Sequence, residues 1–486
     1  MKLFTSRPTI IAGLGRRGAT LAADFCRHGH RITVIEQAPS SADHVLARRL
    51  GFKLVIGNAS APETLREAGI RNAERLIALC GEDNTNIEIA LESHELRKAM
   101  NPNSPPLACH VHIYDRRLEE ALQRYGMERL RDRIGLQFFN VYEQTARRLA
   151  QHYPLHEDRL TDSGLREHFI LIGFGHFGRQ VLLKFVRLGH LANGLRPRFT
   201  IIDRLASQNG RRFSRRNPEV QKLCELSFID LATTDREVID FSFLGDRAGE
   251  TRETPIICFD NDPLCFATAI DLLPACAERH IPFIWTRLAE QRGVAHFLSN
   301  TSPTLQLSRV RPFGGLHEVL RASAFLDDPL DRFARKRHES YCQEEAAKGT
   351  VAEENPSMRS WDELSQDLRN ANREQADHAY IKLRTLGYRL EYGNTAHNTE
   401  PMARFQPSAE EVEMLARMEH NRWMADKLLS GWRYSQVANP ELKFHDNLVP
   451  YEELPEEARE KDRDTVRHLV QELEASGFRI VRTKSV

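Results

Sequence analysis

The sequence has no excess charge of either sign and no long apolar run. Its 486 residues hold 68 Lys and Arg against 68 Asp and Glu, and the mean hydropathy is −0.49. Proteins that work on nucleic acid usually carry a basic excess, so this balance argues against nucleic acid as a partner. No run reaches the roughly 18 apolar residues of a spanning helix, and the N-terminal segment shows no signal-peptide core. We therefore expect a cytoplasmic protein without direct membrane insertion.

Cysteine is sparse and shows no motif spacing. The eight cysteines form no CxxC pair, which argues against a disulfide framework and against a zinc site. Most lie in apolar surroundings, as Cys258 does before Phe259, and we expect reduced, mostly buried thiols. The acid-rich stretch 452–464 predicts a solvated helix start and no metal site.

The N-terminal part of the chain contains a strand, a glycine-rich turn and a helix in succession. The apolar run Thr9–Ala12 leads into Gly13–Gly18, with the sequence GLGRRG, and a second strand at Arg31–Ile35 ends at Glu36. This order is the dinucleotide-binding fingerprint, in which glycines bring backbone N–H groups to a pyrophosphate at a helix N-terminus. The acid is placed to accept hydrogen bonds from a ribose.

The same pattern occurs a second time further along the chain. Phe169–Ile172 leads into Gly173–Gly178, with the sequence GFGHFG, and the next strand at Phe199–Ile202 ends at Asp203. Two such units, each with the acid in place, predict two Rossmann-type lobes with parallel sheets. The alternative, that the glycines only make a tight turn, stays open for each unit.

Further motifs around the first glycine turn resemble the TrkA-N (RCK N-terminal) domain. They are Gly57–Ser60, Leu65–Ile70, Ala73–Leu79 and Glu82–Asn86. The resemblance implies regulation of potassium channels or transporters through bound NAD(H), ATP/ADP or a related nucleotide. Asn58 stands where that family's GDAT motif has an Asp, which leaves the choice of nucleotide open.

The second unit carries a weaker version of these motifs. Ile229–Thr233 keeps an acid, Asp230, and Cys258–Asp262 matches Cys80–Asn84. The resemblance covers roughly 7–150 and 166–310. A helix expected between the units would link paired lobes, as in TrkA-N-like proteins, and two lobes in one chain would form an internal pseudo-dimer.

Five arginines follow Asp203 without an intervening acid. They are Arg204, Arg211, Arg212, Arg215 and Arg216. Such a group can meet extra phosphates, as in NADP or a phosphorylated signalling nucleotide. The plainer interpretation is a solvated insertion loop, and we favour it.

The C-terminal half is also duplicated. Ala334–Tyr341 recurs 82 residues later as Ala416–Trp423, and Trp361–Leu364 recurs 90 residues later as Tyr451–Leu454. The repetition predicts two helical units of about 70 residues each. We expect a looser segment at 391–408 between them.

The second copy resembles the RyR domain, the repeat named after ryanodine-receptor channels. The motifs are His420–Trp423, Gly431–Tyr434, His445 and Leu448–Tyr451. The first copy lacks the second of these motifs and has Tyr341 in place of Trp423, so it would be a degenerate repeat. The resemblance implies a binding module and no catalytic constellation.

Helical spacing separates two faces in the second copy. Met414, Met418, Ala425 and Leu428 should face a core, whereas His420, Trp423 and Lys427 fall on the opposite face. A Trp beside a cation and an imidazole can stack a purine and meet its phosphate. The alternative, with Trp423 packed under the 431–434 loop and His420 bonded to backbone, stays open.

The predicted architecture is α/β followed by all-α. The domains are a TrkA-N-like lobe (1–136), a linker helix (137–165), a second lobe (166–312), a degenerate RyR-like repeat (325–395) and an RyR-like domain (408–486). Predicted nucleotide-binding residues are Gly13, Gly15, Arg16, Gly18, Glu36 and Asn58 in the first lobe and Gly173, Gly175, His176, Phe177, Gly178, Asp203, Arg204 and Asp230 in the second. Predicted ligand-binding residues of the RyR-like half are His420, Trp423, Lys427, Trp432 and Tyr434.

These features favour a nucleotide-sensing regulator over an enzyme. An adenine nucleotide, NAD(H) or ATP/ADP, would bind the glycine turns, and a separate membrane channel or transporter would respond. Two alternatives remain: a sensor of a nucleotide messenger in an anti-phage system, and an NAD(P)-dependent oxidoreductase. The sequence shows no acid/base pair, nucleophile elbow or P-loop, and a Rossmann fold alone does not make an enzyme. Further assembly into a homo-oligomer is also open.

Overall fold

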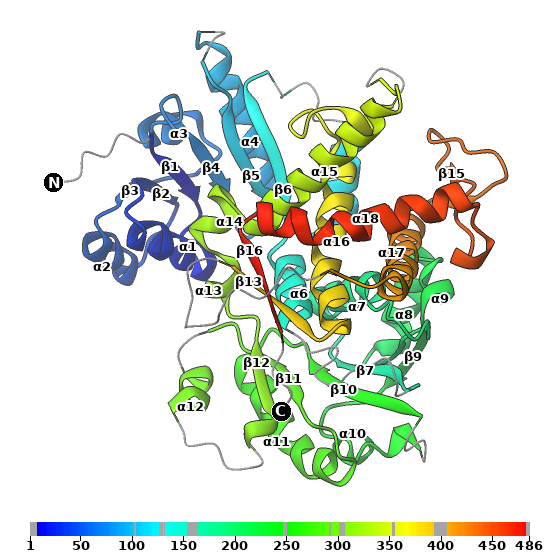
Figure 1. Cartoon of the computed structure of the whole chain (residues 1–486). Helices are drawn as coiled ribbons and strands as arrows, with labels where there is room; N and C mark the ends of the chain where they lie inside the picture. The colour runs from blue at the N-terminus through cyan, green and yellow to red at the C-terminus, as the bar shows by residue number, and fades with distance from the viewer. Residues whose placement is uncertain are drawn as a thin grey trace. The chain divides into compact units, whose positions relative to one another are not determined.

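A computed structural model describes most of the chain (Figure 1). The described residues are 7–101, 104–125, 130, 132–152, 164–245, 250–290, 293–300, 307–351, 355–392 and 406–482. They divide into two compact units, Met1–Thr145 with Gly315–Asp327 and Ala146–Gly314 with Asp328–Val486. None of the helices in these residues is both long enough and apolar enough to cross a membrane.

The first unit is built on a six-stranded parallel sheet with the strand order β3-β2-β1-β4-β5-β6. Its central strands β1 (Thr9–Ala12) and β4 (Arg75–Ala78) are buried along their whole length, as expected for a parallel sheet covered on both faces. The other strands are β2 (Ile32–Glu36), β3 (Lys53–Ile56), β5 (Leu107–His112) and β6 (Ile134–Phe139). The helices are α1 (Arg16–Arg27), α2 (Ser41–Leu50), α3 (Pro62–Ala68), α4 (Asp83–Lys98) and α5 (Arg116–Tyr125).

The second sheet repeats this topology, with the order β9-β8-β7-β10-β11-β12. Its strands are β7 (Arg166–Ile172), β8 (Arg198–Asp203), β9 (Glu225–Asp230), β10 (Thr251–Ile257), β11 (Ile284–Arg287) and β12 (Val310–Phe313). Its helices are α7 (His176–Leu188), α8 (Ala206–Arg216), α9 (Val220–Leu223), α10 (Arg236–Ile239), α11 (Asp262–Glu278) and α12 (Val294–Asn300). When the strands of each sheet are numbered from its own first strand, both sheets have the Rossmann order 3-2-1-4-5-6. This order confirms the two predicted lobes.

Two sequence expectations change at this level. The arginine-rich stretch is the helix α8 and not an insertion loop, because Ala206, Gly210 and Phe213 recur at helical spacing and are buried. The first sheet continues to Phe139, beyond the predicted boundary at 136, because Phe138 and Phe139 are buried at the end of β6. The expected linker helix is α6 (Val141–His152), and its remaining residues 153–163 lie outside the described chain.

A short segment from beyond the second lobe belongs to the first unit. It contains α13 (Leu316–Val319) and α14 (Ala322–Leu326). The carboxylate of Asp24 in α1 accepts a 2.8 Å hydrogen bond from the N–H of Ala322, the first residue of α14. The ring of Phe325 packs edge-on against Phe139, with centroids 5.2 Å apart.

The C-terminal half consists of two helix–helix–strand repeats. The first contains α15 (Pro329–Ala347), α16 (Gln366–Thr385) and β13 (Tyr388–Tyr392). The second contains α17 (Ala409–Leu429), α18 (Glu456–Ala475) and β16 (Phe478–Arg482), with short strands β14 (Arg433–Tyr434) and β15 (Phe444–His445) between its helices. The region is helical as predicted, and these strands are additions to the expected all-α architecture. Most of the looser segment expected at 391–408 lies outside the described residues.

The two repeats are related by an approximate local two-fold axis. Strands β13 and β16 pair antiparallel, and Leu390 lies opposite Ile480, its own equivalent in the second copy. The contacts repeat as well. His338 bonds the Arg359 carbonyl through Nε2, and His420 bonds the Val449 carbonyl in the same way, both at 2.8 Å. The duplication predicted from the sequence is therefore confirmed in three dimensions.

Candidate functional site

The glycine turn of each lobe needs glycine at two of its three positions for reasons internal to the fold. Gly13 and Gly173 have φ angles of +98° and +100°, which disfavour any other residue. A Cβ at Gly18 would lie 1.9 Å from the Gly13 carbonyl oxygen, and one at Gly178 would lie 2.2 Å from that of Gly173. These four glycines let the first helix of each lobe start close to its strand.

The middle glycine of each turn has no such internal reason. Gly15 has φ −48° and Gly175 has φ −71°, which any residue adopts. A Cβ at either position would meet nothing within 4 Å. Among the described residues no side chain caps α1 or α7, and neither helix has an acid in its first turn. Each middle glycine therefore leaves an open approach to a helix N-terminus, where an anion is favoured.

The acids at the ends of the second strands hold the turns in place. Glu36 Oε2 accepts a hydrogen bond from the N–H of Leu14 at 2.8 Å, and Asp203 Oδ2 accepts one from Phe174 at 2.9 Å. The second oxygen of Asp203 accepts from the N–H of Leu205, as that of Glu36 does from the N–H two residues further along. Both lobes thus place a carboxylate beside the turn, where a ribose hydroxyl can reach its remaining lone pairs.

The polar residues after the third strands differ between the lobes. Asn58 Oδ1 accepts hydrogen bonds from the N–H and the hydroxyl of Ser60, both at 3.0 Å, and so closes a local turn. Asp230 Oδ1 accepts from the N–H of Ser207 in the first turn of α8 at 2.7 Å, and this bonding lowers the pKa of the Asp230 carboxyl. Asp230 lies opposite Asp203 in the β8–β9 register.

The remaining predicted residues of the glycine turns fall into two groups. Arg16, His176 and Arg204 are exposed beside the turns. Phe177 is fully buried, with its ring 5.8 Å from that of Phe313 and the Arg287 guanidinium 5.0 Å from its centroid. Phe177 therefore belongs to the core of the lobe, and only its backbone can take part in binding.

Two residues near the second turn were missed by sequence reasoning. Leu205 is 56% exposed although it is apolar, and it lies two residues from Asp203. The ring of Phe259 lies where a Cβ on Gly173 would come within 2.9 Å of it. Cys258 is structurally equivalent to Leu79, because the N–H of each donates to the carbonyl of the last residue of the central strand in its own lobe. The sequence match of Cys258 to Cys80 is therefore one residue out of register. For Leu205, the sequence signal was an apolar residue close to Asp203 within a polar stretch.

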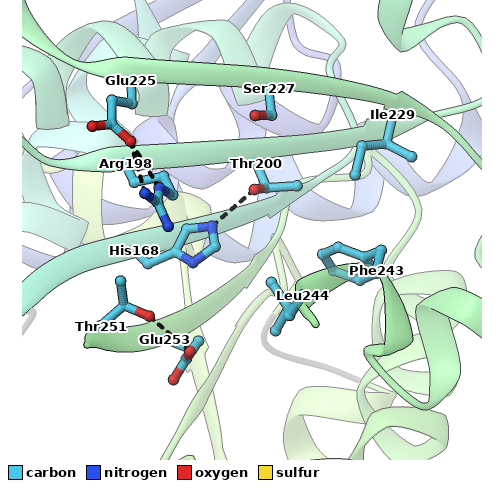
Figure 2. A pocket seen from close by; sticks show the side chains of 10 residues that line it. All are labelled: His168, Arg198, Thr200, Glu225, Ser227, Ile229, Phe243, Leu244, Thr251 and Glu253. Carbon is cyan, nitrogen blue, oxygen red and sulfur yellow. Dashed lines mark hydrogen bonds and ion pairs between the residues drawn. The ribbon is translucent and has the colours of Figure 1, made fainter. Parts of the chain in front are cut away.

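A separate pocket of about 260 Å³ lies on the sheet of the second lobe (Figure 2), and none of its lining residues belongs to the glycine turn. Six of its polar side chains are bonded in pairs: His168 to Thr200, Arg198 to Glu225 and Thr251 to Glu253. Phe243 and Leu244 form its apolar edge. The pocket lies toward the amino ends of the strands, whereas ligands of open α/β sheets bind at the carboxyl ends.

The second RyR-like copy gathers aromatic rings around one lysine. The Lys427 ammonium lies 4.2 Å from the ring centroid of Trp432 and 6.0 Å from that of Trp423. The ring of His445 packs edge-on against Trp423 at 4.9 Å and lies 6.0 Å from Trp432. Burial lowers the pKa of Lys427. We call Trp423, Lys427, Trp432 and His445 the aromatic cluster.

Two predicted residues lie beside the aromatic cluster. The His420 ring stacks on Trp423 with centroids 5.7 Å apart, but it is only 2% exposed and its Nε2 bonds the Val449 carbonyl, so it supports the cluster from the buried side. Of the two alternatives for His420, the structure shows the one in which it bonds backbone, because the 448–451 segment covers that side of α17. Tyr434 is 53% exposed on β14, where it pairs with His445. In the first copy Tyr341 replaces Trp423, and its hydroxyl accepts a 2.9 Å hydrogen bond from Asn355.

Comparison with known proteins agrees with these two regions. A Trk system potassium uptake protein TrkA of Streptomyces coelicolor is 35% identical over 118 residues, 24% of this chain and 49% of that protein. The protein of the same name from Halomonas elongata is 37% identical over 89 residues, 18% of this chain and 19% of that protein. The chain thus spans less than half the length of these relatives.

Among solved structures, the comparison matched the GsuK channel. The structure of GsuK bound to ADP is 17% identical with a TM-score of 0.42, over 65% of this chain and 68% of that one. GsuK bound to NAD is 15% identical with the same TM-score, over 67% and 66%. By family models, residues 9–130 match the TrkA-N domain and residues 404–482 match the RyR domain, as the motifs in each region predicted.

Proposed function

We propose that this chain is a regulator that binds an adenine nucleotide at its glycine turns and acts on potassium transport by a separate membrane protein. Support for potassium comes from the TrkA-N match and from the relatives named as Trk system potassium uptake proteins. Those relatives are matched over less than half of their length. The proposal therefore has two parts that are tested separately: nucleotide binding, which is the inner proposal, and the role in potassium transport, which is the outer proposal.

The observation that carries nucleotide binding is the pair of middle glycines. Gly15 and Gly175 are required neither by backbone conformation nor by packing, yet each stands at an uncapped helix N-terminus. A pyrophosphate that approaches the backbone there explains both. Glu36 and Asp203 lie where a ribose would follow, and the exposed Leu205 offers an apolar contact to an adenine.

The route from the second nucleotide site to the RyR-like half is α7. Its N-terminus forms the glycine turn, and its second half contacts the helical repeats. Lys184 Nζ donates to Glu374 at 2.8 Å and to Asp377 at 2.9 Å, both in α16. Arg187 Nε lies 3.5 Å from Asp426 Oδ1 in α17. Asp426 precedes Lys427 of the aromatic cluster, so a change at the turn has a short path of buried contacts to it.

The aromatic cluster is the proposed second ligand site. Trp423 and Trp432 are half-buried rings of the kind that stack a purine, and Lys427, which lies beside both rings, would then meet its phosphate. Regulation requires that the two sites bias one equilibrium, which takes a few kcal/mol of differential binding.

The decisive experiment is a thermal-shift screen of the full chain with NAD, NADH, NADP, ATP, ADP, ADP-ribose and cyclic nucleotides. A ligand at 100 times its Kd should stabilise its unit by about 2.7 kcal/mol. Gly15→Asp and Gly175→Asp place a carboxylate at the pyrophosphate position, while Asp at an N-cap favours the helix, so the folded protein should survive. We expect each variant to lose the shift from its own lobe. Trp423→Ala should abolish only a shift from the RyR-like half.

A lack of any shift in the wild type contradicts nucleotide binding. A shift that persists in the Gly15→Asp/Gly175→Asp double variant moves the site out of the turns. For the outer proposal, potassium uptake by cells lacking this chain should be restored by the wild type and not by the double variant. Equal restoration by both would separate any potassium role from the glycine turns.

A further inference from the structure

The second lobe carries an unbalanced group of arginines beside its glycine turn. Arg212 and Arg216 are exposed on α8, and Arg179 is half-buried on α7. None of the three makes an ion pair with a carboxylate among the described residues. The Nε atom of Arg179 is buried and has no hydrogen-bond partner there.

The side chain of Arg179 reaches from α7 to α8 and to the glycine turn. Arg179 Nη2 donates to Asn209 Oδ1 at 3.3 Å, and its guanidinium lies 5.6 Å from the ring of Phe174 in the glycine turn. On α8, Arg212 and Arg216 stand three and seven residues after Asn209, so all three share the face that meets Arg179.

Electrostatics agrees with this placement. Burial lowers the pKa of Arg179, and the positive charges of Arg216 and Arg212 lower it further against the opposing effect of Asp203. Three cations therefore lie near Asp203, which is itself bonded to the backbone of the turn, and Asp230 lies opposite Asp203 and bonds the first turn of α8. Such a group is completed by an anion.

The first lobe has no such group, although its turn has the same geometry. Ala19 stands at the position of Arg179, counted from the equivalent glycines. The N-terminus of α2 is closed by a capping box in which Ser40 and Asp43 bond each other's backbone N–H groups. The arginine group is thus particular to the second lobe, while the glycine turn is common to both.

We propose that the second lobe takes an adenine nucleotide whose ribose carries a phosphate, and that Arg179, Arg212 and Arg216 bind this phosphate. The proposal rests on nucleotide binding at Gly175. We place the ribose at Asp203, whose carboxylate, like Arg212 and Arg216, lies close enough to Arg179 to affect its pKa. A docking surface for nucleic acid or lipid would require only exposed arginines, and it would not account for the half-buried Arg179.

The test is titration calorimetry of the full chain carrying Gly15→Asp, which leaves the second turn as the open site, with NAD and NADP as probes. We expect NADP to bind about tenfold or more tightly than NAD, as a charge-assisted phosphate contact provides. Arg212→Gln/Arg216→Gln should remove this preference and leave the NAD affinity nearly unchanged. The matched control is Arg48→Gln/Arg49→Gln on the exposed side of α2, which should change neither.

Each outcome bears on a different claim. Equal binding of NAD and NADP, or a preference that survives Arg212→Gln/Arg216→Gln, overturns this inference and leaves nucleotide binding intact. Failure of both nucleotides to bind the wild type contradicts the proposed function itself. If the arginine variant instead weakens binding of a single-stranded DNA oligonucleotide without changing the NADP preference, α8 is a docking surface and the inference is wrong.

Discussion

The two Rossmann lobes use the same position of their first helix in opposite ways. In α1 the residue is Asp24, whose carboxylate accepts a hydrogen bond from the N-terminus of α14. In α7 the equivalent residue is Lys184, whose ammonium bonds Glu374 and Asp377 of α16. The glycine turns preceding both helices are nearly identical in geometry. The duplicated lobes therefore keep the turn and differ in what their first helix is fastened to.

This difference shows where specialisation occurs in the chain. The acid–turn hydrogen bonds, 2.8 Å in one lobe and 2.9 Å in the other, are the shared part. The arginine group and the contact of the first helix with the helical repeats belong to the second lobe. The second lobe has a described path to the RyR-like half through Lys184 and Arg187 of α7.

The largest expected effect comes from breaking the lysine contact. Lys184→Met would leave Glu374 buried without its main partner, and we expect the second unit to lose about 3–5 kcal/mol of unfolding free energy. Asp24→Asn keeps an acceptor for the Ala322 N–H and should cost about 1 kcal/mol or less. Urea denaturation of both variants measures this contrast. Equal losses of unfolding free energy in the two variants would mean that these contacts stabilise α1 and α7 equally.

The Lys184 contact also predicts acid sensitivity. Burial raises the pKa of Glu374, but Lys184 and Arg187 outweigh it and hold the pKa at about 2. The stabilisation is therefore present above the ordinary pKa of about 4.3 and is lost as pH falls through the folded value. Lys184→Met should flatten the loss of stability below about pH 4.3. An unchanged acid limb would show that Lys184 does not set this pKa.

A second comparison concerns two of the buried histidines, His112 in the first unit and His378 in the second, where His190 also has a pKa lowered by burial. Burial lowers the pKa of His112 to about 3 and that of His378 to about 4, so both are neutral in the folded protein. Lys382 and Arg422 add to this effect at His378 and Glu419 opposes it. The unfolded chain binds a proton near pH 6.5, so stability should fall as pH drops from there toward each folded pKa.

The expected loss is about 2 kcal/mol per histidine between pH 6.5 and 5. His378→Gln should flatten the pH dependence of the second unit only, and His112→Gln that of the first only. Thermal unfolding at a series of pH values measures both slopes. If either variant leaves its slope unchanged, that histidine is not the group that titrates.

The smallest expected effect on stability concerns the N-caps of α2 and α8, the helices that follow Glu36 and Asp203. Ser40 caps α2 through its side chain, whereas Leu205 at the N-cap of α8 makes no side-chain cap and Asp230 bonds Ser207 instead. Ser40→Ala should cost about 1 kcal/mol, and Leu205→Ala should cost almost nothing. Thermal unfolding of the two variants side by side decides it. A cost at Leu205 equal to that at Ser40 would contradict the difference in capping.

The glycine turns could be predicted well because every part of the signal is local. A strand, three glycines, a helix and an acid lie within about 30 residues, which is the size of one βαβ unit. The duplication of the RyR-like half was also visible, since its offsets of 82 and 90 residues follow the same contacts that pair His338 with Arg359 and His420 with Val449. The burial of side chains such as Phe177 and His420 could not be settled from the sequence because it depends on segments that arrive from elsewhere.

By itself, the sequence determined the two lobes, the glycine turns, the position of each acid and the repeated helical units, because periodicity and turn chemistry act over short stretches of chain. Only the tertiary structure decided which charges meet. Lys184 finds Glu374 across 190 residues, and Arg179 meets the arginines of α8 through Asn209. A local sequence pattern determines which helix or strand a side chain belongs to and which face it lies on. Its partner comes from a segment distant in sequence that the tertiary fold packs against that face, and a buried charge is stable only where such a partner is present.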